Sequence, residues 1–119
     1  MRSEVSEELD KMIERGIIEK VELSKLVSNI VVVKKKSGKI RICVDFRLAN
    51  KAIILDSHPI SHVEDLLSSF KGARYFSKLD MSSAYHQVNL HEESHDLTTF
   101  VTHEGLFRFK PISSGLASA

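Results

Sequence analysis

Several residue types are scarce in this chain of 119 residues, and each scarcity excludes a class of protein. It has no tryptophan, two prolines and a single cysteine, Cys43. One cysteine cannot form an internal disulfide, and among apolar neighbours it is expected to be a buried, inert thiol. No apolar run approaches the roughly 18 residues that a membrane-spanning helix needs. Residues 1–8 lack the apolar stretch of a secretory signal, so the sequence predicts an intracellular setting, cytoplasmic or nuclear.

What is present suits one globular domain or part of one, with 42% hydrophobic and 28% charged residues. The net charge is only +1, but residues 31–51 carry seven basic side chains and one acidic side chain. This basic block comprises Lys34, Lys35, Lys36, Lys39, Arg41, Arg47 and Lys51. Positive side chains on a hairpin can hold a polyphosphate or a nucleic-acid backbone. They can equally be a solvated face that keeps an exposed hairpin soluble.

The hydrophobic pattern predicts an α+β order of helix, hairpin, helix, strand and hairpin. Residues 3–15 have the helical period, with Ser3 as N-cap and Gly16 just beyond the end. The apolar face of this helix comprises Val5, Leu9, Met12 and Ile13. The later predicted elements are strands 30–33 and 40–44, a capping box at 61–64 opening a helix that Gly72 ends, a strand toward Asp80, a hairpin of 97–102 with 106–110, and a turn entering a helix at 113–119.

The most informative segment is 75–87, where an apolar-aromatic run ends in Asp80 and a small Ser-Ser-Ala step leads to Tyr85. A carboxylate at the end of a strand can hold a hard cation. Backbone amides just beyond it can face phosphate oxygens. An aspartate in this position is also a common helix N-cap, and Asp80 can serve both purposes.

A second candidate motif is His91-Glu92-Glu93-Ser94-His95, which matches the H-E-x-x-H pattern of zinc hydrolases. In those enzymes two histidines four residues apart on a helix bind Zn²⁺, and the glutamate is the general base. The motif here is polar on nearly every side, whereas a zinc helix sits in a core. A polar surface turn or short helix is therefore favoured, and a zinc hydrolase using His91, Glu92 and His95 is the remote alternative.

In this order the motifs resemble the N-terminal half of the reverse transcriptase domain of gypsy-type long-terminal-repeat retrotransposons. The segments that carry the resemblance are 16–19, 31–47, 59–67, 71–80 and 99–107. The resemblance implies a partial reverse transcriptase domain over residues 1–119, an α+β fold comprising part of the fingers and palm of a right-hand polymerase. Residues 1 to about 75 would be fingers-like, and about 76–119 would start a palm that is truncated before it is complete.

The resemblance also implies roles for individual residues. Asp80 would be catalytic and would bind the Mg²⁺ or Mn²⁺ ions of a two-metal nucleotidyl transfer. Tyr85 would lie under the sugar and reject a 2′-hydroxyl, with a core aromatic as its alternative. The remaining implied contacts are Lys35 and Arg41 with the triphosphate, the amides of Met81, Ser82, Ser83 and Ala84 with the phosphates, and Lys34, Lys36, Lys39 and Arg47 with nucleic acid. Asp45, Phe46 and Arg47 would be structural and template-side.

Two departures from the family pattern limit the expected activity. The family completes its metal site with a later Asp-Asp pair, which this sequence does not contain. Ser114 stands where the family has an aromatic beside the nucleotide pocket. The sequence therefore predicts a fragment of an RNA-directed DNA polymerase that is inactive alone. Its implied partners are a template-primer, dNTPs, and the rest of a polyprotein or a second copy. The alternative is a domesticated or decayed nucleic-acid-binding remnant that uses the basic hairpin.

Overall fold

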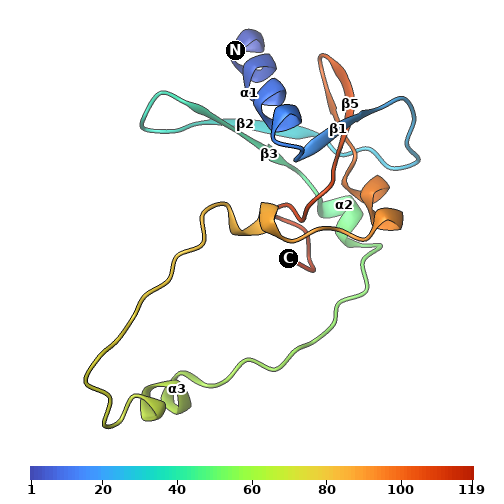
Figure 1. Cartoon of the computed structure of the whole chain (residues 1–119). Coiled ribbons are helices and arrows are strands. Elements are labelled where there is room, and N and C mark those ends of the chain that lie inside the picture. The colour runs from blue at the N-terminus through green and yellow to red at the C-terminus, as the bar shows by residue number, and fades with distance from the viewer.

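The computed structural model describes residues 1–119 and places two small antiparallel sheets beside one helix (Figure 1). One sheet has the strand order β1-β5-β4, and the other pairs β2 with β3. The elements are α1 (Arg2–Glu14), β1 (Ile18–Val21), β2 (Ile30–Lys34), β3 (Ile40–Val44), α2 (Arg47–Asn50), α3 (Val63–Ser69), the 3-10 helices η1 (Ala84–Gln87) and η2 (Glu92–Thr98), β4 (Phe100–Thr102) and β5 (Gly105–Phe109).

Helix α1 forms where the apolar period predicted it, and it packs against β3 and β1. Val5 and Leu9 are buried, but Ile13 is 43% exposed, because it lies at the edge of the apolar face near the helix end. The predicted cap at Ser3 is wrong. The helix begins at Arg2, and its N-cap Met1 makes no side-chain capping bond. Gly16 follows the helix with φ +68, as expected of a residue just past a helix C-terminus.

Four phenylalanines form the centre of the core. Phe100 packs against Phe107 and Phe109 with ring centroids 6.0 and 5.3 Å apart, and Phe46 meets Phe109 edge-on at 6.2 Å. Aromatic pairs at these separations are stabilising beyond the area they bury. The other buried apolar residues of the core are Val5, Leu9, Ile17, Ile18, Ile40, Ala49 and Leu116.

Both predicted hairpins are confirmed. Strands β2 and β3 pair from Ile30 with Val44 to Lys34 with Ile40, and β4 pairs with β5. Strand β1, which the sequence did not predict, pairs with β5 from Ile18 opposite Phe109 to Val21 opposite Leu106. Its four residues, two of them charged, are too short a run to show a strand period, so only the distant partner reveals it.

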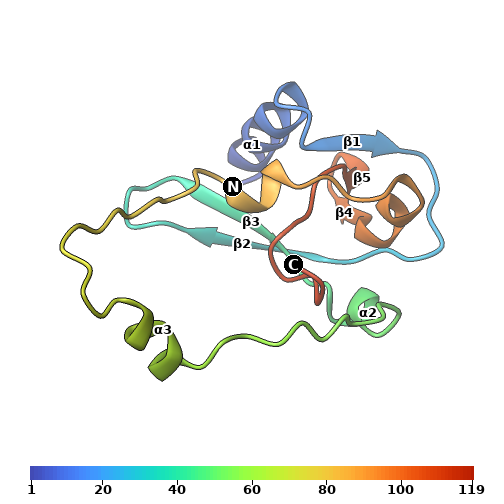
Figure 2. The same cartoon turned by 60° about the horizontal axis from the view of Figure 1, so that its bottom comes forward.

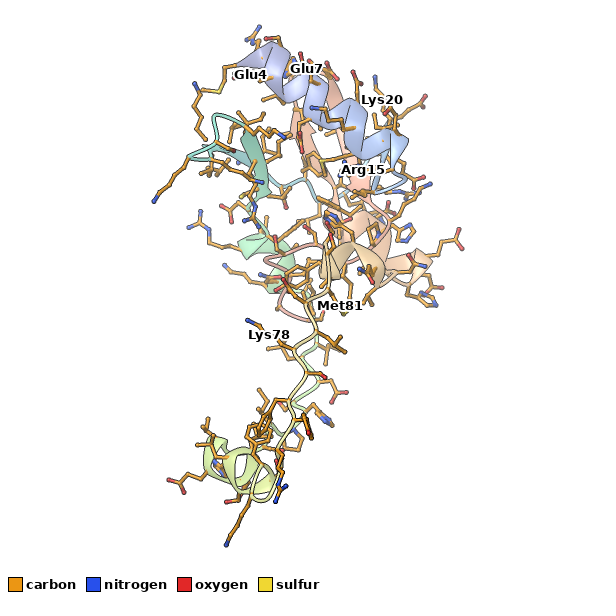
Figure 3. The ribbon with its side chains drawn as sticks, turned by 60° about the vertical axis from the view of Figure 1, so that its left-hand side comes forward. Glu4, Glu7, Arg15, Lys20, Lys78 and Met81 are labelled. Atoms are coloured by element: carbon orange, nitrogen blue, oxygen red, sulfur yellow. The ribbon has the colours of Figure 1, made fainter.

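Residues 54–89 are all exposed, and the part of this run that precedes η1 forms an excursion away from the body (Figures 1 and 2). Its only α-helix, α3, buries no residue; the predicted capping box is absent, since the N-cap is His62 and makes no side-chain capping bond. The predicted strand toward Asp80 is also absent. No other strand lies beside this segment to supply hydrogen bonds. The segment is extended where it joins the excursion to the body, as the labels Lys78 and Met81 mark in Figure 3.

The C-terminal segment 113–119 forms turns rather than the predicted helix, with Leu116 inserted into the core. Cys43 is free and only partly buried, because it faces away from the core on β3. None of the helices combines the length and the apolar character that crossing a bilayer requires.

The phenylalanine cluster gives a test of where stability resides. Phe100 is fully buried, so we expect Phe100→Ala to lower the free energy of unfolding by about 3–5 kcal/mol. Phe70 in the excursion is 51% exposed and contacts only Phe76 among the aromatic rings, so Phe70→Ala is the matched control and should change stability by less than about 1 kcal/mol. Urea unfolding followed by circular dichroism measures both. Equal effects would show that the excursion belongs to the cooperative core.

Candidate functional site

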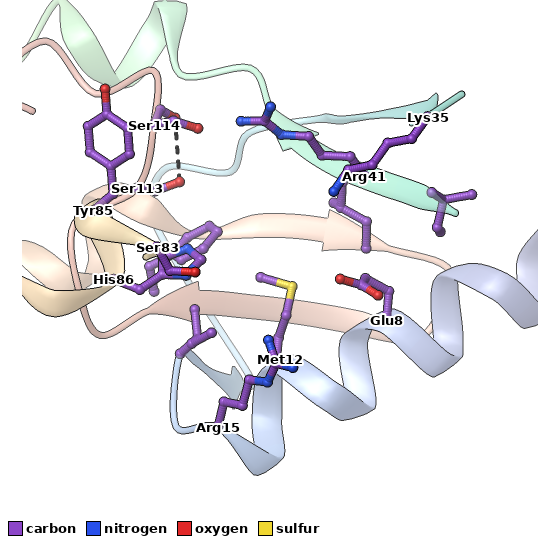
Figure 4. Close-up of a pocket in the computed structure, with 14 residues that line it drawn as sticks. Glu8, Met12, Arg15, Lys35, Arg41, Ser83, Tyr85, His86, Ser113 and Ser114 are labelled. Carbon is purple, nitrogen blue, oxygen red and sulfur yellow. Dashed lines mark hydrogen bonds between the residues drawn. The ribbon is translucent and has the colours of Figure 1, made fainter. Parts of the chain in front are cut away.

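A surface pocket of about 340 Å³ lies where α1, the β2–β3 hairpin, η1 and the C-terminal turn meet (Figure 4). Its walls bring together four residues that the sequence assigned to nucleotide binding, which are Lys35, Arg41, Ser83 and Tyr85. These residues come from opposite sides of the excursion. The fold therefore assembles part of the predicted nucleotide site without a contribution from the excursion's far end.

The β2–β3 hairpin positions the two cations. Arg41 lies on β3 opposite Val33. The Lys35 amide donates to the Lys39 carbonyl at 2.8 Å, and the Gly38 amide donates to the Lys35 carbonyl at 3.0 Å. Gly38 adopts φ +80, which this tight turn requires and glycine permits without strain. Lys35 is thereby fixed at the first position of the turn, with its side chain on the pocket wall.

The opposite wall begins at Ser83, the one non-glycine residue with positive φ, at φ 51 and ψ 49. Such strain persists only where the surroundings enforce it, and it is common at functional sites. Here it turns the extended chain into η1, which carries Tyr85. Beyond η1, the Ile112 amide donates to the Val88 carbonyl at 2.7 Å, which holds η1 beside the turn. Tyr85 is 50% exposed and lines the pocket, so it is not a core aromatic.

Four further polar pocket residues were not singled out from the sequence. They are Glu8 from α1, Arg15 at its C-cap, His86 from η1, and Ser113. The helical period of α1 predicted its buried face but not which element its polar face would meet. The adjacency of His86 to Tyr85 was the only available signal.

His86 lines the pocket from η1, next to Tyr85. Desolvation against the pocket wall, followed by repulsion from the Arg15 guanidinium, lowers the pKa of His86 below its ordinary value. The imidazole is therefore neutral at pH 7. The cationic character of the pocket at that pH comes from Lys35, Arg41 and Arg15, with Glu8 as the opposing carboxylate.

Asp80 and the first two amides after it lie outside this pocket. Asp80, Met81 and Ser82 are exposed on the excursion, and Ala84 is the first residue of η1. Nowhere in the chain do three His, Cys, Asp or Glu side chains come close enough to hold a metal ion. A pair of Mg²⁺ ions needs several oxygen donors in fixed geometry. The donors present here do not fit a two-metal site, and Asp80 alone can supply only one of its ligands.

The zinc alternative loses its structural basis. His91 is the N-cap of η2 and His95 lies within it, so the motif is not on an α-helix. Side chains four residues apart point about 40° apart on an α-helix but about 120° apart on a 3-10 helix. The His95 ring nitrogen instead lies 3.3 Å from the Leu90 carbonyl oxygen. The short polar helix favoured from the sequence is confirmed.

The remaining predicted nucleic-acid contacts lie at two places. Lys34 ends β2, and Lys36 and Lys39 lie in the exposed turn beyond it. Arg47 is held by Asp45, with its Nε 2.9 Å from one carboxylate oxygen and 3.0 Å from the other. The hydrogen bonds from Arg47 lower the pKa of Asp45, so this pair stays ionised over the physiological range.

Comparison with known proteins decides the family. Residues 33–119 match the family described as reverse transcriptase (RNA-dependent DNA polymerase). The chain belongs to the reverse transcriptase family. This reverse transcriptase segment is 40% identical to an uncharacterized protein of Caenorhabditis elegans, over 97% of this chain and 9% of that protein. It is 35% identical to the retrovirus-related Pol polyprotein from transposon 412 of Drosophila melanogaster, over 98% of this chain and 10% of the polyprotein.

Solved reverse transcriptase structures have the same fold. The prototype foamy virus protease-reverse transcriptase CSH mutant superposes with a TM-score of 0.78 at 21% identity, covering 95% of this chain and 15% of that one. The foamy viral protease-reverse transcriptase in complex with an RNA/DNA hybrid gives 0.76 at 17% identity, covering 98% and 16%. The predicted α+β segment of a reverse transcriptase is thus confirmed. The chain spans about a tenth of the length of the curated relatives named above.

The lowered pKa of His86 gives a test of the pocket in solution. We expect a ¹H–¹⁵N NMR titration to place its midpoint below the ordinary value of about 6.5, and Arg15→Gln to raise that midpoint by removing the repulsion. Because the folded-state pKa is lowered, the contribution of His86 to stability is present above about pH 6.5 and is lost as the pH falls toward the folded-state pKa. Arg74→Gln, a change in the excursion, is the matched control and should leave the midpoint in place.

Proposed function

We propose that this chain forms the nucleotide-binding part of an RNA-directed DNA polymerase. The observation that carries the proposal is the pocket that gathers Lys35, Arg41 and Tyr85 beside η1. Ammonium and guanidinium groups hold phosphate oxygens with charge-assisted hydrogen bonds. In this proposal Lys35 and Arg41 bind the triphosphate of a dNTP, and the Tyr85 ring lies against the sugar and excludes a 2′-hydroxyl.

Asp80 is proposed as the chain's own ligand to a divalent cation, Mg²⁺ or Mn²⁺. The metal would neutralise phosphate charge and polarise the reacting oxygens when bound. Since the chain's other carboxylates do not gather around Asp80, further donors have to come from additional sequence of the kind that the longer relatives possess. The amides of Met81, Ser82, Ser83 and Ala84 are proposed to face the phosphates once Asp80 is held in place.

The exposed excursion supports the proposal that additional sequence completes the site around Asp80. Its large apolar side chains include Leu66, Phe76 and Leu79, which are 48, 66 and 94% exposed. Isolated domains rarely leave this much apolar surface uncovered. We propose that the remainder of a polyprotein covers the excursion and thereby seats Asp80. The boundary near residue 75 between fingers and palm, and membership of the gypsy-type group, stay predictions.

A nucleic-acid template-primer is the proposed second partner. The exposed cations Lys34, Lys36 and Lys39 suit phosphate contacts, and Arg47 is the first residue of α2, shortly after the hairpin. A nucleic-acid-binding remnant that has lost the reaction is the second candidate, and the same three lysines favour it. The two candidates differ in whether the pocket binds dNTPs.

Binding of dTTP to the 119-residue chain tests the pocket. With Mg²⁺ present, we expect Lys35→Ala and Arg41→Ala each to weaken binding roughly tenfold or more, because each loses a charge-assisted contact to phosphate. Lys78→Ala and Arg74→Ala remove the same charges from the excursion and should leave the Kd within twofold or so. Isothermal titration calorimetry measures all four. Equal losses in both pairs would leave only non-specific electrostatic attraction.

Primer extension tests the metal site separately. Since one carboxylate cannot fix two divalent ions, the chain alone should incorporate no more nucleotide than an Asp80→Ala variant, in either Mg²⁺ or Mn²⁺. Extension of a labelled primer, resolved on a gel, gives the comparison. Incorporation that exceeds the Asp80→Ala level would mean that the chain completes a metal site by itself.

A further inference from the structure

The side chain of Asn50 joins two segments that are far apart in the sequence. Its Nδ2 donates to the Gly115 carbonyl at 2.9 Å, and its Oδ1 accepts from the Ala117 amide at 2.8 Å. Asn50 is the last residue of α2. Its neighbours Phe46 and Ala49 are buried in the core, and its own amide donates to the Phe46 carbonyl at 2.8 Å. The backbone of Asn50 is thus held against the core, and its side-chain amide extends from this fixed position.

The segment that Asn50 holds is the turn 113–117, which has an inner and an outer side. On the inner side, Leu116 is buried in the core. Gly115 adopts φ +92, and a Cβ there would lie 3.7 Å from the Phe46 ring. Ser114 lies on the outer side, where it lines the pocket opposite the hairpin together with the buried Ser113. The position of the turn thus decides where this wall of the pocket stands (Figure 4).

We propose that Asn50 is a positioning residue for the nucleotide pocket, holding the Ser113–Ser114 wall at a fixed distance from Tyr85. The inference rests on the proposed function of that pocket. Asparagine suits the role because one short, planar group offers both a donor and an acceptor, which match a carbonyl and an amide two residues apart. An aspartate of the same shape would keep the acceptor but would set a carboxylate oxygen against the Gly115 carbonyl.

The two hydrogen bonds of Asn50 form a clamp, and this Asn50 clamp also explains how the pocket tolerates a serine at position 114. A large side chain could hold this wall by its own packing, whereas the Ser114 side chain makes no hydrogen bond and lies at the pocket surface. The wall is held from behind instead, through the main chain on either side of Leu116. The backbone of this wall therefore keeps its position even though the Ser114 side chain makes no hydrogen bond of its own.

Amide hydrogen exchange and dTTP binding on the same variants test the proposal. We expect Asn50→Ala, which removes both hydrogen bonds without adding charge, to speed exchange of the Ala117 amide roughly five- to tenfold and to raise the Kd for dTTP with Mg²⁺ by a similar factor. Asn50→Asp keeps the acceptor for the Ala117 amide but repels the Gly115 carbonyl, so it should raise the Kd with a smaller change in Ala117 exchange. Asn89→Asp is the matched control, because Asn89 is exposed and its side chain makes no hydrogen bond. Circular dichroism verifies that each variant is folded.

The outcomes separate the clamp from the pocket. Unchanged Ala117 exchange in Asn50→Ala would overturn the clamp. Faster exchange with an unchanged Kd would make Asn50 merely structural and overturn the positioning role. If the unsubstituted chain bound no dTTP, the proposed function would fail and the positioning role with it, while Ala117 exchange would still report on the clamp. Faster exchange in Asn50→Ala and weaker binding in both Asn50 variants, with neither in Asn89→Asp, support the proposal.

Discussion

The pairing of β5 between β1 and β4 is the contact on which the rest of the molecule depends. Phe107 and Phe109 on this strand supply half of the aromatic cluster. Just beyond the strand, the Lys110 amide donates to the Ile17 carbonyl, and the Lys110 carbonyl accepts from Leu90. One continuous stretch of backbone therefore aligns the end of α1 and the chain that follows η1. The candidate pocket exists because these elements share that partner.

The pocket is built from surfaces that carry little stability of their own. Lys35 and Arg41 belong to a two-stranded hairpin, which is marginal without support, and Tyr85 lies on a single 3-10 turn. Packing of α1 against β3 anchors the hairpin, and hydrogen bonds to the extension of β5 anchor the turn. Contacts with the core therefore hold the pocket residues in place. The Asp80 segment has no such contacts and is extended.

The sequence predicted what local patterns encode. The α1 period, the β2–β3 turn around Gly38 and the β4–β5 hairpin all depend on residues within one element or its neighbour, and all three are confirmed. Strand β1 and the pairing of Asn50 with the C-terminal turn were not predictable, because each is specified by a partner far along the chain. The strand expected at Asp80 does not form for a related reason: a strand needs a neighbouring strand for its backbone hydrogen bonds, and none lies beside this segment.

The long-range pairing of β1 with β5 also sets the order in which the molecule can fold. Glu19 and Arg108, which form an ion pair across these strands, are separated by 89 residues. During synthesis, helix α1 and the basic hairpin emerge early but have no sheet to complete their core until β5 is made. Topologies of this kind fold slowly, because the loop must close before its contacts stabilise it. Until β5 has been synthesised, the N-terminal half therefore keeps apolar surface exposed, where chaperones and other nascent chains can bind it.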